Sequence, residues 1–321
     1  MTHEVTLIPG SGTGPELAAV AKDVLAHAGV SVNWDVQDCA DGDVTAAVAS
    51  VKRTGVALKG AVAASVRVGK LPPSLQLRKD LGVNTIVRHV KGIPGLPARA
   101  PETDIVIIRE ASEDIYSGFE HQSTEGVFES VKVTTRAACE RITQFAFDYA
   151  KANGRGRVTT VHKANIMKKA DGLFLSVGRE IAAKHPELKH DDVIVDALCM
   201  KIVRRPRDFD VLVCGNLFGD IVSDCAAGMA GGPTVATGTS IGPNVTVFES
   251  SHGGTDPAEG AANPYPMILL AGQLAGHLGH TDAAARIRKA VETCLQAGLH
   301  TPDMGGGASV AQVHEAVIKA L

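Results

Sequence analysis

The stretch LIPGSGTGPEL, residues 7–17, joins an apolar run to a helix-like run through three glycines that alternate with single residues. A dinucleotide-binding Rossmann turn needs the pattern G-x-G-x-x-G, and an acidic residue ends its second strand. Here Pro15 follows the glycines at once, which is typical of a first helical position. Asp35 lies inside the expected second strand, and Asp38 falls just past it. We therefore expect a tight strand-to-helix turn near a ligand in place of a Rossmann pyrophosphate loop.

The composition is that of an ordinary globular protein. The chain has 321 residues, of which 45% are hydrophobic and 21% charged, and its net charge of −3 gives no reason to expect nucleic acid or an anionic membrane as partner. No apolar run approaches the roughly 20 residues of a membrane span. The first residues show no signal-peptide pattern, so we expect a cytoplasmic protein. The six cysteines form no C-x-x-C pair, which predicts buried, reduced thiols.

Short apolar runs alternate with amphipathic stretches along most of the chain. This alternation predicts an α/β architecture with largely parallel strands. We expect strands over 4–10, 30–36, 56–62, 104–110, 157–164 and 210–216, helices over 15–29, 43–55, 134–154, 171–185, 282–298 and 308–321, and a mixed segment over 192–206.

Three further segments bear on the organisation of the chain. Residues 123–135, STEGVFESVKVTT, alternate with period two around a glycine and predict a projecting β-hairpin, a device that often serves dimerisation. Pro- and Gly-rich breaks at 91–101 and 231–244 indicate crossings between two sub-domains.

The segment CGNLFGDIVSDCAAGMAGG, residues 214–232, places two carboxylates four residues apart. On a helix, Asp220 and Asp224 project from one face, one turn apart. The functional interpretation is a divalent cation, Mg²⁺ or Mn²⁺, held by oxygen ligands. The alternative is a pair of solvated aspartates. A third acid, Asp196, follows the apolar run VIV, where we expect a strand to end.

Several candidate polar residues stand at distinct places in the sequence. Arg109 ends an expected strand, and Lys163 and Asn165 follow another. Arg78 and Arg88 flank RKDLGVNTIVR, and Tyr116 lies in SEDIYSG. Arginine suits bidentate capture of carboxylates, and a lysine beside a strand end can act as an acid or base. The candidates are Arg78, Arg88, Arg109, Lys163, Asn165 and Tyr116. Taken singly, Arg109 also fits a surface ion pair with Glu110, and Tyr116 fits a core position.

Together these segments resemble the β-decarboxylating dehydrogenases, the isocitrate and 3-isopropylmalate dehydrogenase family. The resemblance spans nearly the whole chain and rests on IPGSGTGPE, VALKG, LRKDLG, IIREASEDIYSGFEH, VHKANIMKKADGLF, NLFGDIVSD, FESSHGG, ANP and TPDMGG, in the order of the family. YSGFEH, VHKANIMKKADGLFL and TPDMGG look most similar to the NAD-dependent isocitrate dehydrogenases.

The resemblance implies a two-domain α/β sandwich without a Rossmann nucleotide site. Residues 1–95 and 241–321 would form a large NAD-binding domain, and residues 96–240 a small metal-binding and dimerisation domain. NAD would lie against residues 250–264, with His252, Gly253, Asp256, Glu259 and Asn263 as cofactor-binding residues.

The resemblance also implies the roles of the site residues in an oxidative decarboxylation of a 2-hydroxy-3-carboxy acid. Arg78, Arg88 and Arg109 would bind the substrate carboxylates, with Asn165 beside them. Lys163 would take the hydroxyl proton, and Tyr116 would protonate the product enolate. Asp220 and Asp224 of one subunit would hold Mg²⁺ or Mn²⁺, with Asp196 and Lys163 reaching in from the partner of a homodimer with shared active sites.

The chain departs from the family pattern where the third arm of the substrate binds. The S-x-N of isocitrate enzymes becomes Pro72 and Ser74, and two cations, Arg67 and Lys70, appear in the same loop. Added cations favour an anionic third arm, so we expect a tricarboxylate-like small molecule, isocitrate or an analogue such as 2-phosphonomethylmalate or homoisocitrate. 3-Isopropylmalate, whose third arm is apolar, is a further alternative, but the hydrophobic pocket that it needs is not obvious in the sequence. The alternative is that Arg67 and Lys70 merely face water.

The cofactor-selecting segment departs as well. The acidic residue expected at the ribose hydroxyls is displaced by one, to Asp256, with Glu259 nearby, and the Lys-Tyr pair of NADP enzymes is missing. NAD remains the expected cofactor. Two other interpretations stay open, a non-catalytic regulatory subunit of a heteromeric isocitrate dehydrogenase and a metal-binding structural protein. The presence of Tyr116 and Lys163 favours the catalyst over both.

Overall fold

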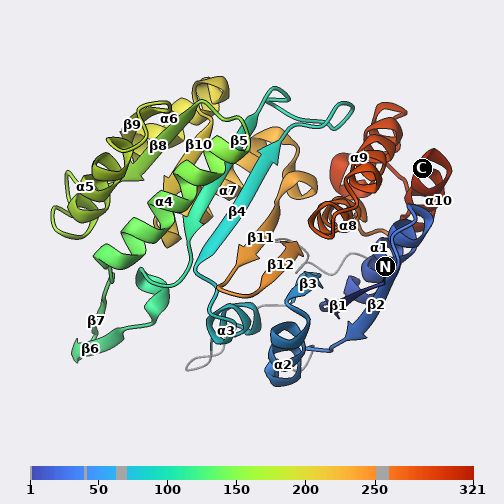
Figure 1. Ribbon diagram of the computed structural model, residues 1–321, viewed down its shortest axis with the longest axis horizontal. Helices are drawn as coiled ribbons and strands as arrows, with labels where there is room; N and C mark the ends of the chain where they lie inside the picture. Colours follow the sequence, from blue (N-terminus) through green and yellow to red (C-terminus); the bar gives the residue numbers. More distant parts are fainter. Residues whose placement is uncertain (1, 40–41, 63–70, 251–259) are drawn as a thin grey trace. The chain divides into compact units, whose positions relative to one another are not determined.

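The structure is a computed structural model and describes residues 2–39, 42–62, 71–250 and 260–321. The chain divides into two compact units, each labelled by element in Figure 1. Unit 1 comprises residues 1–83, 92–101 and 231–321, and unit 2 comprises residues 84–91 and 102–230. The Pro- and Gly-rich breaks at 91–101 and 231–244 coincide with passages of the chain from one unit to the other.

Unit 1 has a five-stranded run in the order β2-β1-β3-β12-β11, in which only β11 and β12 pair antiparallel. Its strands are β1 (His3–Ile8), β2 (Val32–Val36), β3 (Val56–Lys59), β11 (Thr237–Ile241) and β12 (Thr246–Ser250). Its helices are α1 (Gly14–His27), α2 (Thr45–Thr54), α3 (Pro73–Asp80), α8 (Tyr265–His277), α9 (Thr281–Gln296) and α10 (Val310–Ala320), with short 3₁₀ turns η3 (Gly232–Val235) and η4 (Pro302–Met304).

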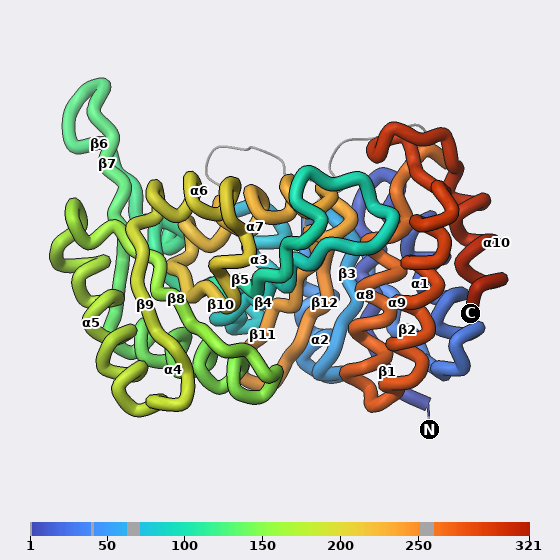
Figure 2. Tube along the Cα trace, turned by 90° about the horizontal axis from the view of Figure 1, so that it is seen from above, coloured from blue at the N-terminus to red at the C-terminus, as the bar shows by residue number. Residues whose placement is uncertain are grey.

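Unit 2 has a five-stranded run in the order β4-β5-β10-β8-β9, parallel except for the pair β4–β5. Its strands are β4 (Thr85–Lys91), β5 (Asp104–Glu110), β8 (Arg157–His162), β9 (Lys189–Ile194) and β10 (Val211–Cys214). Helices α4 (Arg136–Ala152) and α5 (Ala170–Ala182) cover one face, and α6 (Val195–Arg204) and α7 (Asn216–Ala230) cover the other (Figure 2). The 3₁₀ turns η1 (Ile115–Ser117) and η2 (Pro206–Asp208) complete the unit. The predicted α/β class with largely parallel strands is confirmed.

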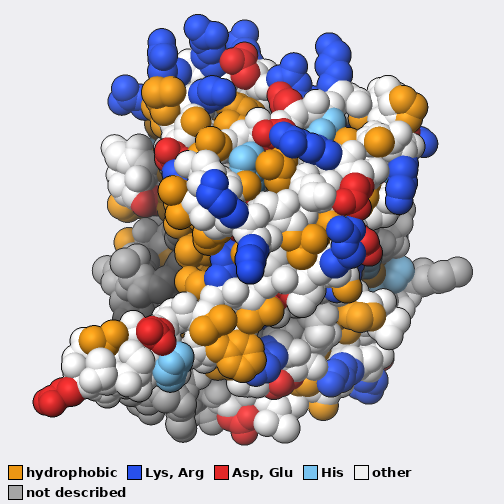
Figure 3. Space-filling model, turned by 90° about the vertical axis from the view of Figure 1, so that its left-hand side faces the viewer, with side chains coloured by type: hydrophobic (Ala, Val, Ile, Leu, Met, Phe, Trp, Pro, Cys, Tyr) orange, Lys and Arg blue, Asp and Glu red, His pale blue; other side chains and the backbone are white. Residues whose placement is uncertain are grey.

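A two-stranded hairpin, β6 (Glu120–Thr124) and β7 (Val127–Ser130), projects beyond the rest of unit 2 on the side of α6 and α7 (Figure 2). Every residue of both strands is exposed, including Phe128 at 68%. The hairpin predicted over 123–135 is therefore present, shifted a few residues toward the N-terminus. Figure 3 shows hydrophobic side chains at the surface of the face turned to the viewer, with Lys and Arg gathered along its upper edge.

The glycines of the opening stretch serve a close approach between two backbones. Gly10 has a φ of +95°, and a Cβ on it would lie 2.3 Å from the carbonyl oxygen of Ala61. A Cβ on Gly60 would lie 2.0 Å from the carbonyl oxygen of Pro9. The backbone N–H of Ser11 donates a hydrogen bond to the carbonyl oxygen of Ala61 at 2.9 Å. The turns after β1 and β3 thus touch main chain to main chain, which only glycine permits. The predicted tight strand-to-helix turn is confirmed.

The sequence patterns do not predict α3, α8, β4, β11 or β12. Helix α8 is buried nearly all round, so its sequence lacks the apolar and polar faces by which amphipathic helices are found. Four cysteines are buried and two, Cys199 and Cys225, are partly exposed, and all six are free thiols. The expectation of full burial is therefore wrong for these two.

Candidate active site

Two of the predicted arginines share one face of the unit 2 sheet. In the antiparallel pair β4–β5, Arg88 lies opposite Ile107 and Ile86 lies opposite Arg109. Because side chains alternate along a strand, Arg88 and Arg109 are diagonal neighbours on the same face. The Cα atoms of such neighbours lie about 7–8 Å apart. Both are buried, with 3% and 1% of their surface exposed. A buried guanidinium group can pair with an anion, so this face of the sheet carries two candidate anion-binding groups.

Arg109 is joined to Asp220 and Tyr116 in one cluster. Its guanidinium forms an ion pair with Asp220 and lies over the ring of Tyr116, 5.2 Å from the centroid. The hydroxyl of Tyr116 donates to the other carboxylate oxygen of Asp220 at 2.7 Å. A predicted substrate-binding arginine, a predicted metal ligand and a predicted acid are therefore in direct contact, although Asp220 stands about a hundred residues from the other two in the chain.

The environment of Tyr116 keeps its proton on the phenol. Burial raises the pKa of Tyr116 to about 12, and the hydrogen bond to Asp220 adds to this shift while Arg109 opposes it. The phenol is therefore protonated over the whole physiological range. A group in that state can donate a proton to an enolate carbon but cannot take one from an alcohol.

Asn216, which the sequence patterns do not single out as a site residue, fixes the direction of Arg109. Its side-chain oxygen accepts a hydrogen bond from Arg109 Nε at 2.9 Å, and its Nδ2 donates to the carbonyl of Glu113 at 3.1 Å. Asn216 is the first residue of α7 and is 2% exposed. The start of the helix that carries Asp220 is thus joined to the strand that carries Arg109.

Lys163 and Asp196 form a second polar pair in unit 2. Lys163 Nζ donates to Asp196 Oδ1 at 2.6 Å, and this hydrogen bond lowers the pKa of Asp196. Lys163 directly follows β8, as predicted, and Asn165 lies exposed in the turn after it. The expected position of Asp196 at a strand end is wrong, because β9 ends at Ile194 and α6 begins at Val195 without a loop. Asp196 lies in the first helical turn and is largely exposed.

The carboxylates of α7 suit part of a divalent-cation site. Asp220 and Asp224 lie one turn apart on this helix, and Asp224 is exposed. Carboxylate oxygens are the ligands that Mg²⁺ and Mn²⁺ prefer. Within the described part of one chain, however, no three His, Cys, Asp or Glu side chains gather as a metal site. The pair on α7 therefore supplies two of the oxygen ligands that such a metal would need.

Arg78, the third predicted arginine, belongs to unit 1 and lies on α3. Its Nε and Nη2 donate to Glu249 Oε1 at 3.1 and 2.9 Å, and Ser240 also donates to Glu249. The other carboxylate oxygen of Glu249 accepts from Lys59 Nζ at 3.3 Å. Burial lowers the pKa of Lys59, and Glu249 opposes that shift. Ser74 precedes Arg78 by four residues on α3 and shares its face.

Unit 1 also contains a cavity of about 240 Å³ beside the opening glycine turn. Ser11, Thr13 and Gly14 line one wall, and Asn263 and Asp303 line another. Asn263 Nδ2 donates to Thr234 Oγ1 and to Asp303 Oδ2, both at 2.9 Å, which fixes the amide at the edge of the cavity. Both the turn and the predicted cofactor residue Asn263 thus face one cavity, and Asp303 is a lining acid that the sequence patterns do not identify.

Six predicted site residues lie outside the described residues. They are the candidate third-arm cations Arg67 and Lys70 and the candidate cofactor residues His252, Gly253, Asp256 and Glu259. Their assignments stay predictions.

Comparison with known proteins decides which family has this arrangement. The family model "Isocitrate/isopropylmalate dehydrogenase" matches residues 4–317. The chain belongs to the isocitrate/isopropylmalate dehydrogenase family. The family resemblance and fold predicted from the motifs are thereby confirmed. A solved isocitrate dehydrogenase from Methylococcus capsulatus superposes with a TM-score of 0.94 at 38% identity, and the match covers 99% of both chains.

Curated relatives of this family member include both regulatory and catalytic chains. A regulatory chain of the mitochondrial NAD isocitrate dehydrogenase of Dictyostelium discoideum is 40% identical over 98% of this chain and 89% of its own length. A catalytic chain of the mitochondrial NAD isocitrate dehydrogenase of Arabidopsis thaliana is 39% identical over 97% of this chain and 87% of its own length. Overall identity therefore does not separate a catalytic from a regulatory role, and the site residues must do so. In the described part of the chain, no helix is long and apolar enough to cross a membrane.

Proposed function

We propose that this chain is a catalytically active NAD-dependent dehydrogenase that oxidatively decarboxylates isocitrate or a close 2-hydroxy-3-carboxy analogue. The observation that carries the proposal is the contact of Arg109, Asp220 and Tyr116 in one cluster. A regulatory subunit has no need of a phenol held protonated beside an anion-binding arginine. The names of the curated relatives support isocitrate as the substrate.

The substrate carboxylates are bound by Arg88 and Arg109 on the sheet face of unit 2, with Arg78 as the third arginine. Ser74 shares the helical face of Arg78, and we assign it to a hydrogen bond with the remaining arm. Arg67 and Lys70 would add positive charge for an anionic arm. Bidentate arginine pairs give both affinity and orientation for carboxylates.

Proton transfers are assigned to Lys163 and Tyr116. Lys163 lies at the end of β8 and takes the proton of the substrate hydroxyl. Tyr116 is protonated at neutral pH and donates a proton to the enolate carbon after CO₂ has left. Asp220, which accepts the phenolic hydrogen bond, orients that proton.

The bound cofactors supply the remaining chemistry, with NAD as hydride acceptor and Mg²⁺ or Mn²⁺ as a Lewis acid at the C2 oxygen. The carboxylates of Asp220 and Asp224 would hold the metal together with Asp196. The unit 1 cavity is assigned as the pocket for NAD, with Asn263 at its edge as a cofactor-binding residue and Asp256 and Glu259 for the ribose hydroxyls. The division into a large NAD-binding domain over 1–95 and 241–321 and a small metal-binding domain over 96–240 stays a proposal; of the two units of the structure, the second takes in 84–91 and the first takes in 92–101 and 231–240.

Exposed apolar side chains support a homodimer with shared active sites. They lie on the hairpin at Phe119, Val127, Phe128 and Val131 and on α6 and α7 at Met200, Val203 and Ile221. Helices α6 and α7 pack on each other, so their exposed residues can form one surface. Such apolar exposure marks interaction sites. The curated relatives are described as mitochondrial, and a cytoplasmic location for this chain stays a prediction.

The test is formation of NADH by the purified chain with Mg²⁺ or Mn²⁺ and, in turn, isocitrate, homoisocitrate, 3-isopropylmalate and 2-phosphonomethylmalate. Isocitrate preferred by about 100-fold in kcat/KM, a difference of about 2.7 kcal/mol, would support the proposal. Preference for the phosphonate would instead identify an enzyme specialised for a more highly charged third arm.

The matched variant is Asp224→Asn, which keeps the size of the side chain and removes one metal-binding charge. We expect loss of metal-dependent turnover with an unchanged circular dichroism spectrum. Wild-type turnover in this variant would overturn the metal assignment. No turnover of any substrate by the wild-type chain, together with stimulation of a second, catalytic chain, would instead identify a regulatory protein.

A further inference from the structure

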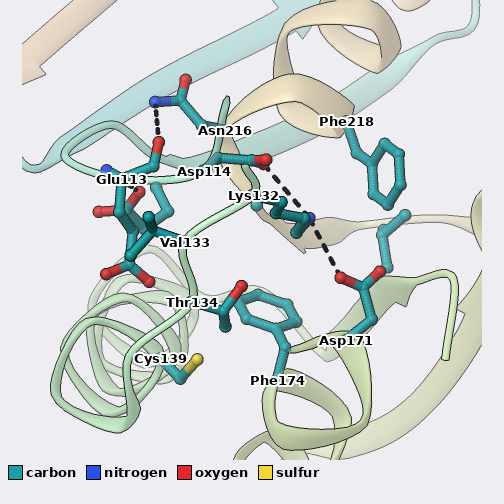
Figure 4. A pocket seen from close by; sticks show the side chains of 13 residues that line it. Glu113, Asp114, Lys132, Val133, Thr134, Cys139, Asp171, Phe174, Asn216 and Phe218 are labelled. Atoms are coloured by element: carbon teal, nitrogen blue, oxygen red, sulfur yellow. Dashed lines mark hydrogen bonds and ion pairs between the residues drawn. The ribbon is translucent and has the colours of Figure 1, made fainter. Parts of the chain in front are cut away.

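A half-buried lysine outside the proposed catalytic set links the segments of unit 2 that carry three of the proposed site residues. Lys132 follows the hairpin, and its Nζ lies 3.4 Å from Asp114 Oδ2 and 3.1 Å from Asp171 Oδ1. Figure 4 shows the ammonium between these two carboxylates, with the ring of Phe218 beside it. Lys132 Nζ lies 4.8 Å from the centroid of that ring. Both carboxylates are buried, and the lysine side chain is 17% exposed.

Asp171 connects Lys132 to the proposed base. Its second oxygen, Oδ2, accepts a hydrogen bond from the backbone N–H of Lys163 at 2.6 Å. Asp171 lies in the first turn of α5, so the carboxylate ties the end of β8 to the start of the following helix. The ammonium of Lys132 and the backbone N–H of Lys163 therefore bind different oxygens of the Asp171 carboxylate, so both contacts can be made at once.

Asp114 connects Lys132 to the proposed acid and to the helix of the metal ligands. Its Oδ1 accepts from the backbone N–H of Ile115 at 2.8 Å, one residue before Tyr116. Its Oδ2 accepts from the backbone N–H of Leu217 at 3.1 Å, in the first turn of α7. The turn of Tyr116 and the helix of Asp220 are thus fixed by one carboxylate.

The backbone of Asp114 shows that this arrangement is held under strain. Its φ of +78° and ψ of −154° are adopted almost only by glycine, and among the described residues no other non-glycine has a positive φ. Such a conformation persists only where the surroundings hold it. Besides its side-chain contacts, Asp114 N donates to the carbonyl of Val133, the neighbour of Lys132, at 3.0 Å.

We propose that Lys132 is a positioning residue that sets the geometry of Lys163, Tyr116 and Asp220 together, through Asp171 and Asp114. The proposal rests on the proposed function of those three residues. The ammonium of Lys132 neutralises the buried carboxylates of Asp114 and Asp171, which would otherwise repel each other and attract water. The cavity lined by this network is only about 20 Å³, roughly the space of one water molecule, so the network leaves little freedom to rearrange.

The test compares Lys132→Met with Lys132→Arg, and with Lys151→Met as the matched control. Lys151 is an exposed lysine of α4 whose ion pair with Glu187 lies at the surface. We expect kcat per folded molecule to fall about 10- to 100-fold in Lys132→Met, a range typical of residues that orient groups at a reaction centre. Lys132→Arg keeps the charge and should recover part of the loss, and the KM for NAD should stay at the wild-type value in all three variants.

A merely structural lysine would give a different result. Lys132→Met would then have a lower melting temperature, but its kcat per folded molecule would equal that of the wild type, and this would overturn the proposal. If Lys132→Met does not fold, Asp171→Asn replaces it. This variant removes the ion pair between Lys132 and Asp171 with almost no change in the shape of the side chain. A wild-type kcat in folded Asp171→Asn would likewise overturn the proposal.

Backbone amide hydrogen exchange separates failure of this proposal from failure of the proposed function. In Lys132→Met, exchange at the amides of Ile115, Lys163 and Leu217 should be faster than in the wild type, whether or not the chain turns over a substrate. Unchanged protection at all three amides would overturn the positioning role. A wild-type chain without activity but with the expected exchange would overturn only the enzymatic assignment.

Discussion

Replacing Gly219 by alanine puts a methyl group against the stem of Arg109. Gly219 lies on α7, and a Cβ at this position would be 2.7 Å from Arg109 Cγ and 2.8 Å from Arg109 Cβ. Real side chains essentially never come so close. Arg109 is buried and held at its far end by Asn216 and Asp220, so its stem cannot swing away without breaking those contacts.

The free-energy change has two opposing parts. Alanine in place of glycine stabilises a helix by up to about 1 kcal/mol, and overpacking a buried site costs about 1–3 kcal/mol. Gly219→Ala should therefore lower the free energy of unfolding by roughly 0–2 kcal/mol. Gly172→Ala on α5 is the control, because a Cβ there meets no atom within 4 Å. It should leave the protein equally stable or more stable.

Activity should change far more than stability. A shift of the guanidinium by about 1 Å from its anion-binding position can cost about 100-fold in rate, so kcat/KM for the substrate should fall by that order in Gly219→Ala. Urea unfolding followed by circular dichroism and NADH formation measure the two quantities. Wild-type kcat/KM in a folded Gly219→Ala variant would refute the role of Arg109 as a fixed anion-binding group.

Two further predictions follow from buried charges. Glu249→Gln leaves the cations of Arg78 and Lys59 without their buried counter-charge and should lower the free energy of unfolding in urea by about 3–5 kcal/mol; unchanged stability would mean that solvent already screens this cluster. Burial lowers the pKa of His89 below its usual 6.5, with Asp104 opposing that shift, so the unfolded chain takes up a proton first as the pH falls. The contribution of His89 to the free energy of unfolding should therefore be fully present above about pH 6.5 and be lost as the pH falls from 6.5 to the lower pKa of the folded state. In thermal melts, His89→Gln should flatten this pH dependence. An equally steep decline of the melting temperature in the variant would assign the pH dependence to other groups.

The sequence predicts well what depends on neighbours in the chain. The alternation of strands and helices, the turn after β1 and the spacing of Asp220 and Asp224 on one helix are local patterns, and the structure has all three. The arginines at 88 and 109 could be named from the sequence. Their place on one sheet face could not, because it depends on the register of β4 against β5.

Contacts between distant residues carry no such local signal. Arg109 and Asp220 are 111 residues apart, and Arg78 and Glu249 are 171 apart. The sequence misplaces Asp196 because the run VIV continues as a strand in any local pattern, whereas α6 begins there without a loop. Lys132 follows an exposed hairpin, so its sequence context indicates solvent, and only the fold brings it between Asp114 and Asp171.

In the proposed homodimer, the hairpin β6–β7 would make the lifetime of the chain depend on its own concentration. An isolated two-stranded ribbon is marginally stable in water, and this one exposes the ring of Phe128 and the edges of both strands. A partner copy that covered the hairpin would keep proteases from cleaving it and other strand edges from pairing with it. A cell that makes too little of the chain for association would present the ribbon uncovered, and degradation would then remove single copies faster than assembled ones.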